Sequence, residues 1–299
     1  MREEVFVAGD DQHLICTLWD DVKNPIGVVQ LIHGMDEHIG RYDRFARFLN
    51  RHGYIVFGDD HRAHGRTAGT PDKIGRVGDN RDLFQATMRD ELEIMRYLRR
   101  RFALPLLLFG HSYGSFIAQR LISDTNICTA GVCLSGSAKY PEWMLEIARG
   151  LAWAGVKMHG ADAPAKFLEL FSPIRGKKNG VSRLTRDAVQ AAAHDADPMR
   201  AEYFSYGFYY SLFDNLLHLQ QKACTETPLL IISGGDDLVS FNSKFAKSLY
   251  RAYKAQDLRY LTFIVYPGAR HELLMETNYE EVQHDILDFF NSAIKKQSL

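Results

Sequence analysis

The feature that most constrains the fold is a glycine-flanked serine, Gly110-His111-Ser112-Tyr113-Gly114. It follows an apolar run at 104–109 and opens a helix-like stretch at 115–122. A serine on so sharp a strand-to-helix turn takes a strained backbone conformation that exposes its hydroxyl, and glycines on both sides let the backbone pack closely. The pattern predicts a nucleophile at Ser112. The alternative is an ordinary helix N-cap, where serine is also favoured.

Around this turn, apolar segments alternate with amphipathic ones. An antiparallel hairpin is predicted over residues 3–19. We expect strands at 28–32, 54–58, 105–109, 130–134, 228–233 and 260–265, and helices at about 40–52, 80–101, 113–123, 241–255 and 278–295. The fold class is therefore α/β, with a mostly parallel sheet and helices on both faces.

The loops after the last two strands supply partners for the serine. A serine hydroxyl needs a base, and the base needs an acid that orients it. One loop offers Asp236 and Asp237, and the loop after the final strand offers His271. The chain order Ser, Asp, His, with each residue just past a strand, is that of an α/β-hydrolase.

The loop after the strand at 28–32 is the expected oxyanion loop. Acyl transfer requires backbone N–H donors aimed at the developing oxyanion. We assign one donor to the N–H of Met35 and the other to the N–H of Tyr113, the residue after the serine. Gly34 keeps this loop thin.

Five motifs in register carry a resemblance to a known family. They are His33-Gly34-Met35-Asp36-Glu37-His38 with Arg41-Tyr42, Asp60-His61-Arg62-Ala63-His64-Gly65-Arg66-Thr67, the serine turn, Gly234-Gly235-Asp236-Asp237-Leu238-Val239, and Tyr266-Pro267-Gly268-Ala269-Arg270-His271-Glu272. Together they resemble the monoacylglycerol lipase and lysophospholipase group of α/β-hydrolases, of serine aminopeptidase S33 type. The resemblance spans about residues 25–290 and is weak between 138 and 220.

The resemblance implies a catalytic triad of Ser112, Asp237 and His271, with Asp237 rather than Asp236 as the acid. It also implies hydrolysis of single-chain lipid esters without a metal or organic cofactor. The chain departs from the group's pattern at two positions: Tyr113 is bulkier than the usual Met or Leu, and Ala63 replaces a usual glycine. Tyr113 bears on the width of the acyl pocket rather than on the chemistry.

Residues 138–220 interrupt the alternation of strands and helices and are rich in aromatic side chains. So long an interval is more than a simple connection, and we predict a helical cap inserted into a core formed by 1–137 and 221–299. A separate C-terminal domain is excluded because the Asp and His loops lie beyond the interval. The aromatic residues expected to line a substrate pocket are Tyr206, Phe208, Tyr209 and Tyr210; the alternative is that they form helix core.

Two other functions compete with ester hydrolysis. An aminopeptidase or amidase on the same scaffold would need a cap carboxylate to bind a free amine. The candidates are Glu142, Glu146, Glu169 and Glu202. A non-catalytic ligand-binding module is disfavoured because all three triad residues are present.

Histidines near the motifs have a structural interpretation. We expect His33, His38 and His111 to hydrogen-bond loop backbone rather than to act in catalysis. His61 and His64 have a spacing that metal ligands also use, but a role in stabilising their loop is favoured, and no metal site is predicted.

Net charge, cysteine spacing and the N-terminal sequence bear on the binding partners and the cellular compartment of the protein. A net charge of -1 gives no sign of nucleic-acid binding. The resemblance implies a small-molecule, lipid-like ester as the partner. The cysteines Cys16, Cys128, Cys133 and Cys224 form no C-x-x-C pair and are predicted to be buried free thiols in a reducing compartment. The N-terminus lacks a signal-peptide pattern, and no apolar run approaches the length of a membrane helix. We therefore expect a soluble, cytoplasmic protein whose membrane contact, if any, is peripheral.

Overall fold

A single eight-stranded sheet forms the centre of the molecule. The computed structural model describes residues 1–80, 82–123, 129–170, 177–178 and 181–297. The strands lie in the order β1-β2-β4-β3-β5-β6-β9-β10. They are β1 (Arg2–Val7), β2 (His13–Trp19), β3 (Gly27–Ile32), β4 (Tyr54–Asp59), β5 (Leu106–His111), β6 (Gly131–Ser135), β9 (Leu229–Gly234) and β10 (Leu261–Tyr266). The pairs β1–β2 and β2–β4 are antiparallel and those from β4 to β10 are parallel, which confirms the predicted α/β fold.

Helices cover both faces because the strands are apolar on both sides. In β5, Leu106 and Leu108 belong to one core cluster, and Leu107 and Phe109 to the other, as the alternation of side chains along a strand requires. The first cluster includes residues of α2 (Leu83–Phe102), α3 (Tyr113–Ser123) and α8 (Lys244–Lys254). The second includes residues of α1 (Asp43–Arg51) and α9 (Tyr279–Gln297).

Several predicted helices begin later than expected. The helix predicted from about 40 divides into the 3-10 helix η1 (Ile39–Tyr42) and α1. Further 3-10 turns are η2 (Gly65–Ala68), η3 (Pro71–Lys73) and η4 (Leu273–Met275). Helix α8 begins at Lys244 because the preceding residues 241–243 all have positive φ, at 53°, 53° and 58°. Left-handed backbone cannot belong to a right-handed helix.

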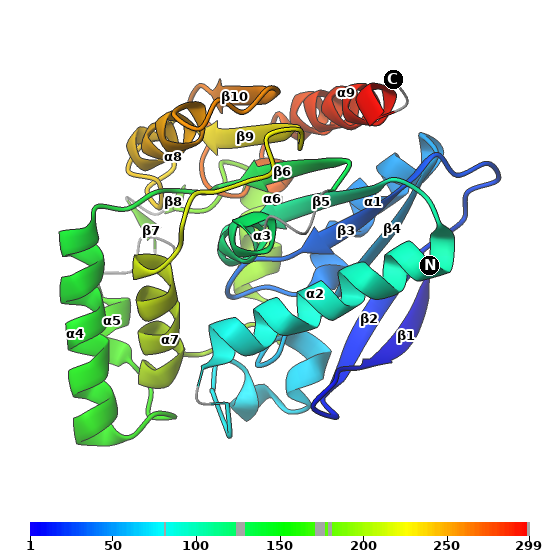
Figure 1. Cartoon of the computed structure of the whole chain (residues 1–299). Coiled ribbons are helices and arrows are strands. Elements are labelled where there is room, and N and C mark those ends of the chain that lie inside the picture. The colour runs from blue at the N-terminus through cyan, green and yellow to red at the C-terminus, as the bar shows by residue number, and fades with distance from the viewer. Residues whose placement is uncertain (81, 124–128, 171–176, 179–180, 298–299) are drawn as a thin grey trace.

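The chain between β6 and β9 forms a separate layer of helices. These are α4 (Glu142–His159), α5 (Lys166–Glu169), α6 (Ala188–Asp195) and α7 (Tyr206–Leu217), with a small ribbon of β7 (Lys177–Lys178) and β8 (Val181–Ser182). In Figure 1, α4 is the outermost of them and α7 lies between α4 and the core. Neither β7 nor β8 joins the large sheet.

Helix α7 is attached to the core at the start of α2. The hydroxyl of Ser211 accepts the N–H of Phe84 at 2.9 Å and donates to Asp82 at 2.7 Å, and Asn215 also donates to Asp82 at 2.9 Å. Asp82 is the N-cap of α2, whose first-turn N–H groups need such acceptors. Helix α7 is therefore bonded directly to the first turn of α2.

Candidate active site

Ser112 occupies the strained turn between β5 and α3. Its φ of 48° lies in the left-handed region that residues other than glycine rarely adopt. Its N–H donates to the carbonyl of Ser135 at 2.9 Å, at the end of β6. A Cβ at Gly114 would lie 2.1 Å from the carbonyl oxygen of Ile32, and one at Gly110 would lie 2.6 Å from that of Gly114. Both glycines are therefore required by close backbone approach, and the strain falls on the serine.

Asp237 and His271 form a buried pair from the loops after β9 and β10. Oδ1 of Asp237 lies 3.0 Å from Nδ1 of His271 and also accepts the N–H of Val239 at 2.8 Å. Burial by itself would raise the pKa of Asp237, but the charge and hydrogen bond of His271 lower it. At His271, burial would lower the pKa, but the charge and hydrogen bond of Asp237 outweigh burial and raise the pKa. Each group thus stabilises the charged form of the other.

The three predicted catalytic residues lie at one edge of the sheet. Strands β5, β6, β9 and β10 are neighbours, and the carboxyl ends of parallel strands meet at the same edge. A Cβ at Gly136 would lie 2.8 Å from Cε1 of His271, and the preceding residue, Ser135, accepts the N–H of Ser112. Nε2 of His271 is buried and has no hydrogen-bond partner among the described residues. Asp236, by contrast, is exposed.

The loop after β3 passes directly beside the serine. A Cβ at Gly34 would lie 3.2 Å from Cβ of Ser112. Within the described part of the chain, the N–H groups of Met35 and Tyr113 make no hydrogen bond. These are the two groups predicted as oxyanion donors, and both remain available to a bound substrate.

The ring of Tyr113 packs into the boundary between the core and the cap. It contacts Phe84 of α2 and Phe208 of α7 at centroid separations of 5.6 and 5.5 Å, and His64 at 6.0 Å. Its side chain is buried. The bulk of this residue is therefore taken up by packing between α2 and α7.

The predicted substrate residues differ in their surroundings. Tyr206, Phe208 and Tyr209 are buried and Tyr210 is half-buried. Phe208 contacts Tyr113, whereas Tyr206 stacks on His159 of α4. Phe208 is thus the member of this set that touches the residue after the serine.

A charged network, to which the sequence assigned no role, connects the loop after β3 to the loop after β10. Arg41 donates to Glu37 at 3.0 Å and to both carboxylate oxygens of Glu272 at 2.7 and 2.8 Å. Glu37 in turn accepts the N–H of Gly34 at 2.5 Å and the hydroxyl of Tyr42 at 2.8 Å. Burial would raise the pKa of Glu272, but Arg41 lowers it to about 2. The signal for this network was the set of charged residues inside two otherwise separate motifs.

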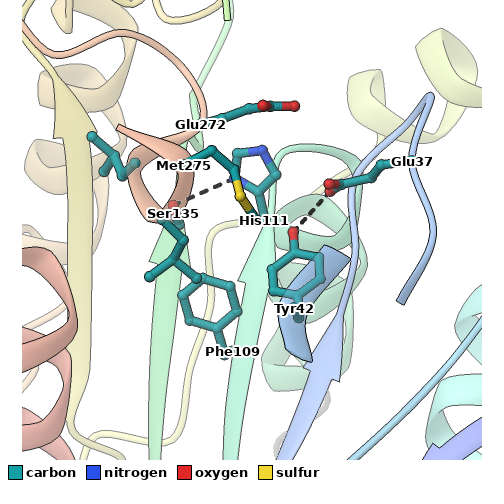
Figure 2. Close-up of a pocket in the computed structure, with 9 residues that line it drawn as sticks. Glu37, Tyr42, Phe109, His111, Ser135, Glu272 and Met275 are labelled. Carbon is teal, nitrogen blue, oxygen red and sulfur yellow. Dashed lines mark hydrogen bonds between the residues drawn. The ribbon is translucent and has the colours of Figure 1, made fainter. Parts of the chain in front are cut away.

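A small cavity lies beside this network (Figure 2). Its volume of about 10 Å³ is close to the minimum for one water molecule. Figure 2 shows the hydrogen bonds from Tyr42 to Glu37 and between His111 and Ser135 at its wall, and burial lowers the pKa of His111 to about 4. The residues that line it are Glu37, Tyr42, Phe109, His111, Ser135, Glu272, Leu273, Leu274 and Met275. It is too small for an acyl chain and contains none of the aromatic residues predicted to bind substrate.

His61 lies in a buried cluster with the carboxyl groups of Asp59 and Glu91. Ligand atoms of Asp59, His61 and Glu91 all lie within 4.8 Å of one another. Nδ1 of His61 is 3.1 Å from Asp59 and 3.1 Å from Glu91. His64 instead packs on Tyr113, and its Nδ1 donates to the carbonyl of Arg62 at 2.9 Å. His61 thus forms a buried ion-paired cluster at the end of β4.

Residues 182–201 are bonded to the loops after β3 and β10. Arg200 donates to Asp36 at 3.0 Å, and Asp197 lies 2.9 Å from Nε2 of His38, both in the oxyanion loop. Arg270, which precedes the histidine, donates to the carbonyl of Thr185 at 3.0 Å and to that of Ser182. Further contacts are those of Arg186 with Glu276 at 2.8 Å and of the Glu272 N–H with the Leu184 carbonyl at 2.9 Å.

Comparison with known sequences identifies the family. The sequence profile of the family described as serine aminopeptidase, S33, matches residues 23–278. The match contains the serine turn, Asp237 and His271. The chain therefore belongs to the serine aminopeptidase S33 family.

Relatives of this S33 family member include proteins named as lipases. The chain is 27% identical to the monoacylglycerol lipase of Mycolicibacterium smegmatis, over 98% of both proteins. It is 26% identical to the monoglyceride lipase of Mus musculus, over 96% of the chain and 88% of that protein.

Solved structures have the same fold as this S33 chain. A thermostable carboxyl esterase from Bacillus coagulans superposes with a TM-score of 0.85 at 24% identity, covering 98% of each chain. A soluble variant of monoglyceride lipase from Saccharomyces cerevisiae superposes with a TM-score of 0.74 at 22% identity, covering 98% of this chain and 94% of the other.

The structure bears on two predictions, the absence of a membrane helix and the burial of the cysteines. Among the described residues, no helix combines the length and apolar character that crossing a bilayer demands. Cys16 and Cys133 are buried thiols, as predicted, but Cys224 is half-buried rather than buried. Cys128 lies outside the described residues.

Proposed function

We propose that this protein is a serine hydrolase that cleaves carboxylic esters of single-chain lipids, of the monoacylglycerol or lysophospholipid type. Ser112 is the nucleophile, His271 the general base and Asp237 the acid that orients it. The observation that carries the proposal is the buried Asp237–His271 pair at 3.0 Å, at the sheet edge where Ser112 occupies its strained turn. An imidazole held in this way keeps Nε2 available for a proton.

The reaction follows from the roles of these groups. As Oγ of Ser112 attacks the ester carbonyl, Nε2 of His271 takes its proton, and the charge of Asp237 stabilises the imidazolium. The N–H groups of Met35 and Tyr113 donate to the oxyanion. His271 then protonates the leaving alcohol, and a water molecule that it deprotonates hydrolyses the acyl-enzyme. The cycle needs no metal or organic cofactor.

We assign residues 138–220 to a cap that binds the acyl chain and residues 1–137 and 221–299 to the catalytic core. Phe208 is the leading candidate among the four aromatic residues because it contacts Tyr113. Burial of an acyl chain contributes about 0.8 kcal/mol per methylene, which favours a cap rich in aromatic side chains. The relatives from Mycolicibacterium smegmatis and Mus musculus are named for hydrolysis of this substrate class.

The outer face of α4 is the surface on which this enzyme would meet a lipid aggregate. Trp143, Ile147, Leu151 and Met158 recur at helical spacing and are each about half or more exposed. An exposed apolar stripe of this kind is typical of peripheral lipid contact. Replacing Trp143 and Met158 by serine should weaken co-sedimentation with phosphatidylcholine vesicles, whereas Val189→Ser, an exposed apolar site on α6, should not. Equal binding by all variants would remove this surface from the proposal.

Amide hydrolysis is the rival activity within the same family. A bound α-amine would need a cap carboxylate, and Glu169 is engaged at 2.6 Å by the N–H of Phe204. Glu142 and Glu146 are exposed on α4, and Glu202 is exposed as well. These positions favour the ester as substrate, and the amide becomes one arm of the test.

The test combines labelling with substrate profiling. A fluorophosphonate probe should label Ser112 alone, because only an activated serine reacts at a useful rate, and Ser112→Ala should abolish the labelling. Activity on p-nitrophenyl esters of graded chain length should exceed that on aminoacyl-naphthylamides. Labelling that persists in Ser112→Ala, or faster cleavage of the amides, would overturn the proposal.

A second experiment tests the acyl site. Phe208→Ala should reduce kcat/KM for long-chain esters much more than for acetate esters, because acetate does not reach the cap. Phe213→Ala removes the same ring further along α7 and should not change this ratio. If both substrates fall equally in Phe208→Ala, the ring is structural core.

A further inference from the structure

The oxyanion loop is held by the side chain of its own first residue. Nδ1 of His33 lies 2.8 Å from the carbonyl oxygen of Gly34, and Nε2 of His33 accepts the backbone N–H of His61 at 3.0 Å. A backbone N–H can only donate, so Nε2 carries no proton. The neutral ring therefore carries its proton on Nδ1 and donates it to the Gly34 carbonyl.

This hydrogen bond sets the direction of the proposed oxyanion donor. The carbonyl of Gly34 and the N–H of Met35 belong to one planar trans peptide group, in which the two bonds point in opposite directions. With the carbonyl held toward His33, the N–H of Met35 faces the other way. The preceding peptide group is held as well, because Glu37 accepts the N–H of Gly34 at 2.5 Å.

The buried, positively charged ring of His61 packs against the ring of His33. Nδ1 of His61 lies 3.1 Å from Asp59 and from Glu91, and its Nε2 lies 3.2 Å from the carbonyl oxygen of His33. The carbonyl oxygen and the charged Asp59 carboxylate are acceptors, so both ring nitrogens carry protons. Burial and the charge of Asp59 raise the pKa of Glu91 to about 8, so Asp59 supplies the counter-charge. Burial would lower the pKa of His61, but Asp59 and its hydrogen bonds outweigh burial and raise the pKa well above its usual value.

The charge on His61 keeps His33 neutral. The two rings stack at a centroid separation of 3.8 Å and an interplanar angle of 15°. Burial, together with the charge of His61, lowers the pKa of His33 well below its usual value. A second proton on His33 would also be aimed at the backbone N–H of His61, where no acceptor is present.

We infer that His33 is a positioning residue that aims the N–H of Met35 at the oxyanion, and that His61, paired with Asp59 and Glu91, keeps His33 in the form that does so. The inference rests on the proposed function. It gives the buried cluster at the end of β4 a part in the rate of acyl transfer, without any contact with substrate.

The test compares an ester with its thionoester. A thiocarbonyl sulfur is a weak hydrogen-bond acceptor, so a thionoester gains little from oxyanion donors. In His33→Leu, kcat for the ester should fall by about 100-fold with KM unchanged, while the thionoester rate changes by about threefold or less. His33→Asn keeps an N–H donor for the Gly34 carbonyl and should restore most of the ester rate. His52→Gln, which removes an imidazole bonded to the Phe48 carbonyl at the end of α1, should leave the ester-to-thionoester ratio as it is.

The outcomes separate this inference from the proposed function. Equal losses for the two substrates in His33→Leu would overturn the inference while Ser112 remains labelled by fluorophosphonate. Absence of labelling in the unaltered protein would overturn the proposed function itself. If His33→Leu does not fold, NMR of the ring nitrogens in the unaltered protein decides: a proton on Nδ1 of His33 and on both nitrogens of His61 supports the inference, and a proton on Nε2 of His33 overturns it.

Discussion

Two glycines in α4 should respond in opposite ways to the same substitution. A Cβ at Gly150 would have no neighbour within 4 Å, whereas one at Gly155 would lie 2.1 Å from Cδ1 of Tyr206. Inside a helix, alanine is favoured over glycine by about 0.5–1 kcal/mol. Gly150→Ala should therefore raise the free energy of unfolding by about that amount.

Gly155→Ala gains the same helix propensity but forces α4 away from α7. Ordinary contact begins at 3.4 Å, so the methyl group and the Tyr206 ring must separate by more than 1 Å. Overpacking of this kind costs about 1–3 kcal/mol. The net result should be a loss of up to about 2.5 kcal/mol in the free energy of unfolding.

Urea unfolding followed by tryptophan fluorescence measures both changes, because Trp143 and Trp153 lie on α4. The same preparations report on function: Gly155→Ala should change the preference between long-chain and acetate esters, and Gly150→Ala should not. Equal stabilisation by the two substitutions would refute the packing of α4 on the Tyr206 ring. A changed chain-length preference in Gly150→Ala would refute the link between this packing and the acyl site.

Three further predictions concern the site and its surroundings. Asp237→Asn should lower kcat by several orders of magnitude, because the acid fixes the imidazole tautomer, while Asp236→Asn should cost little; the reverse ranking in steady-state kinetics would contradict the assignment. Burial would lower the pKa of His271, but Asp237 outweighs burial and raises that pKa above 6.5. Because the general base must be neutral, kcat/KM should rise with pH and reach its half-maximum above 6.5. A pH profile with a lower midpoint would contradict this. Ala63 has a φ of 61°, so Ala63→Gly should raise the free energy of unfolding by about 0.5–1 kcal/mol, and a lower melting temperature would contradict the strain argument.

The core was predictable because its strands are continuous apolar runs. Each predicted parallel strand agrees with the structure within two residues. The start of α8 was not predictable, because residues 241–243 adopt a left-handed backbone and none of them is a glycine that would indicate it. The burial of the cap aromatics was underestimated: α7 packs against both α4 and α2, so more than one of its faces is buried.

The positions of the candidate site were predictable where a residue lies in the loop just past a strand. Ser112 and His271 met that condition, but the choice of Asp237 over Asp236 needed the family register. The bonds of Arg41 to Glu272 join residues 231 positions apart, and no local pattern encodes such a pairing. The same holds for His33 and His61, whose contact depends on β3 and β4 being neighbours.

The bonds from residues 182–201 to the loops after β3 and β10 limit which segments of this chain can be exchanged with those of a relative. Exchange of the whole interval 138–220 with that of a relative would also exchange the partners of Asp36, Arg270 and Glu276. Such a chimera would receive, along with the proposed acyl-binding region, side chains that no longer match the loops of its own candidate site. Exchanging α7, which carries Phe208 and lies outside residues 182–201, would leave those partners native, so under the proposed function acyl preference is best altered through this helix.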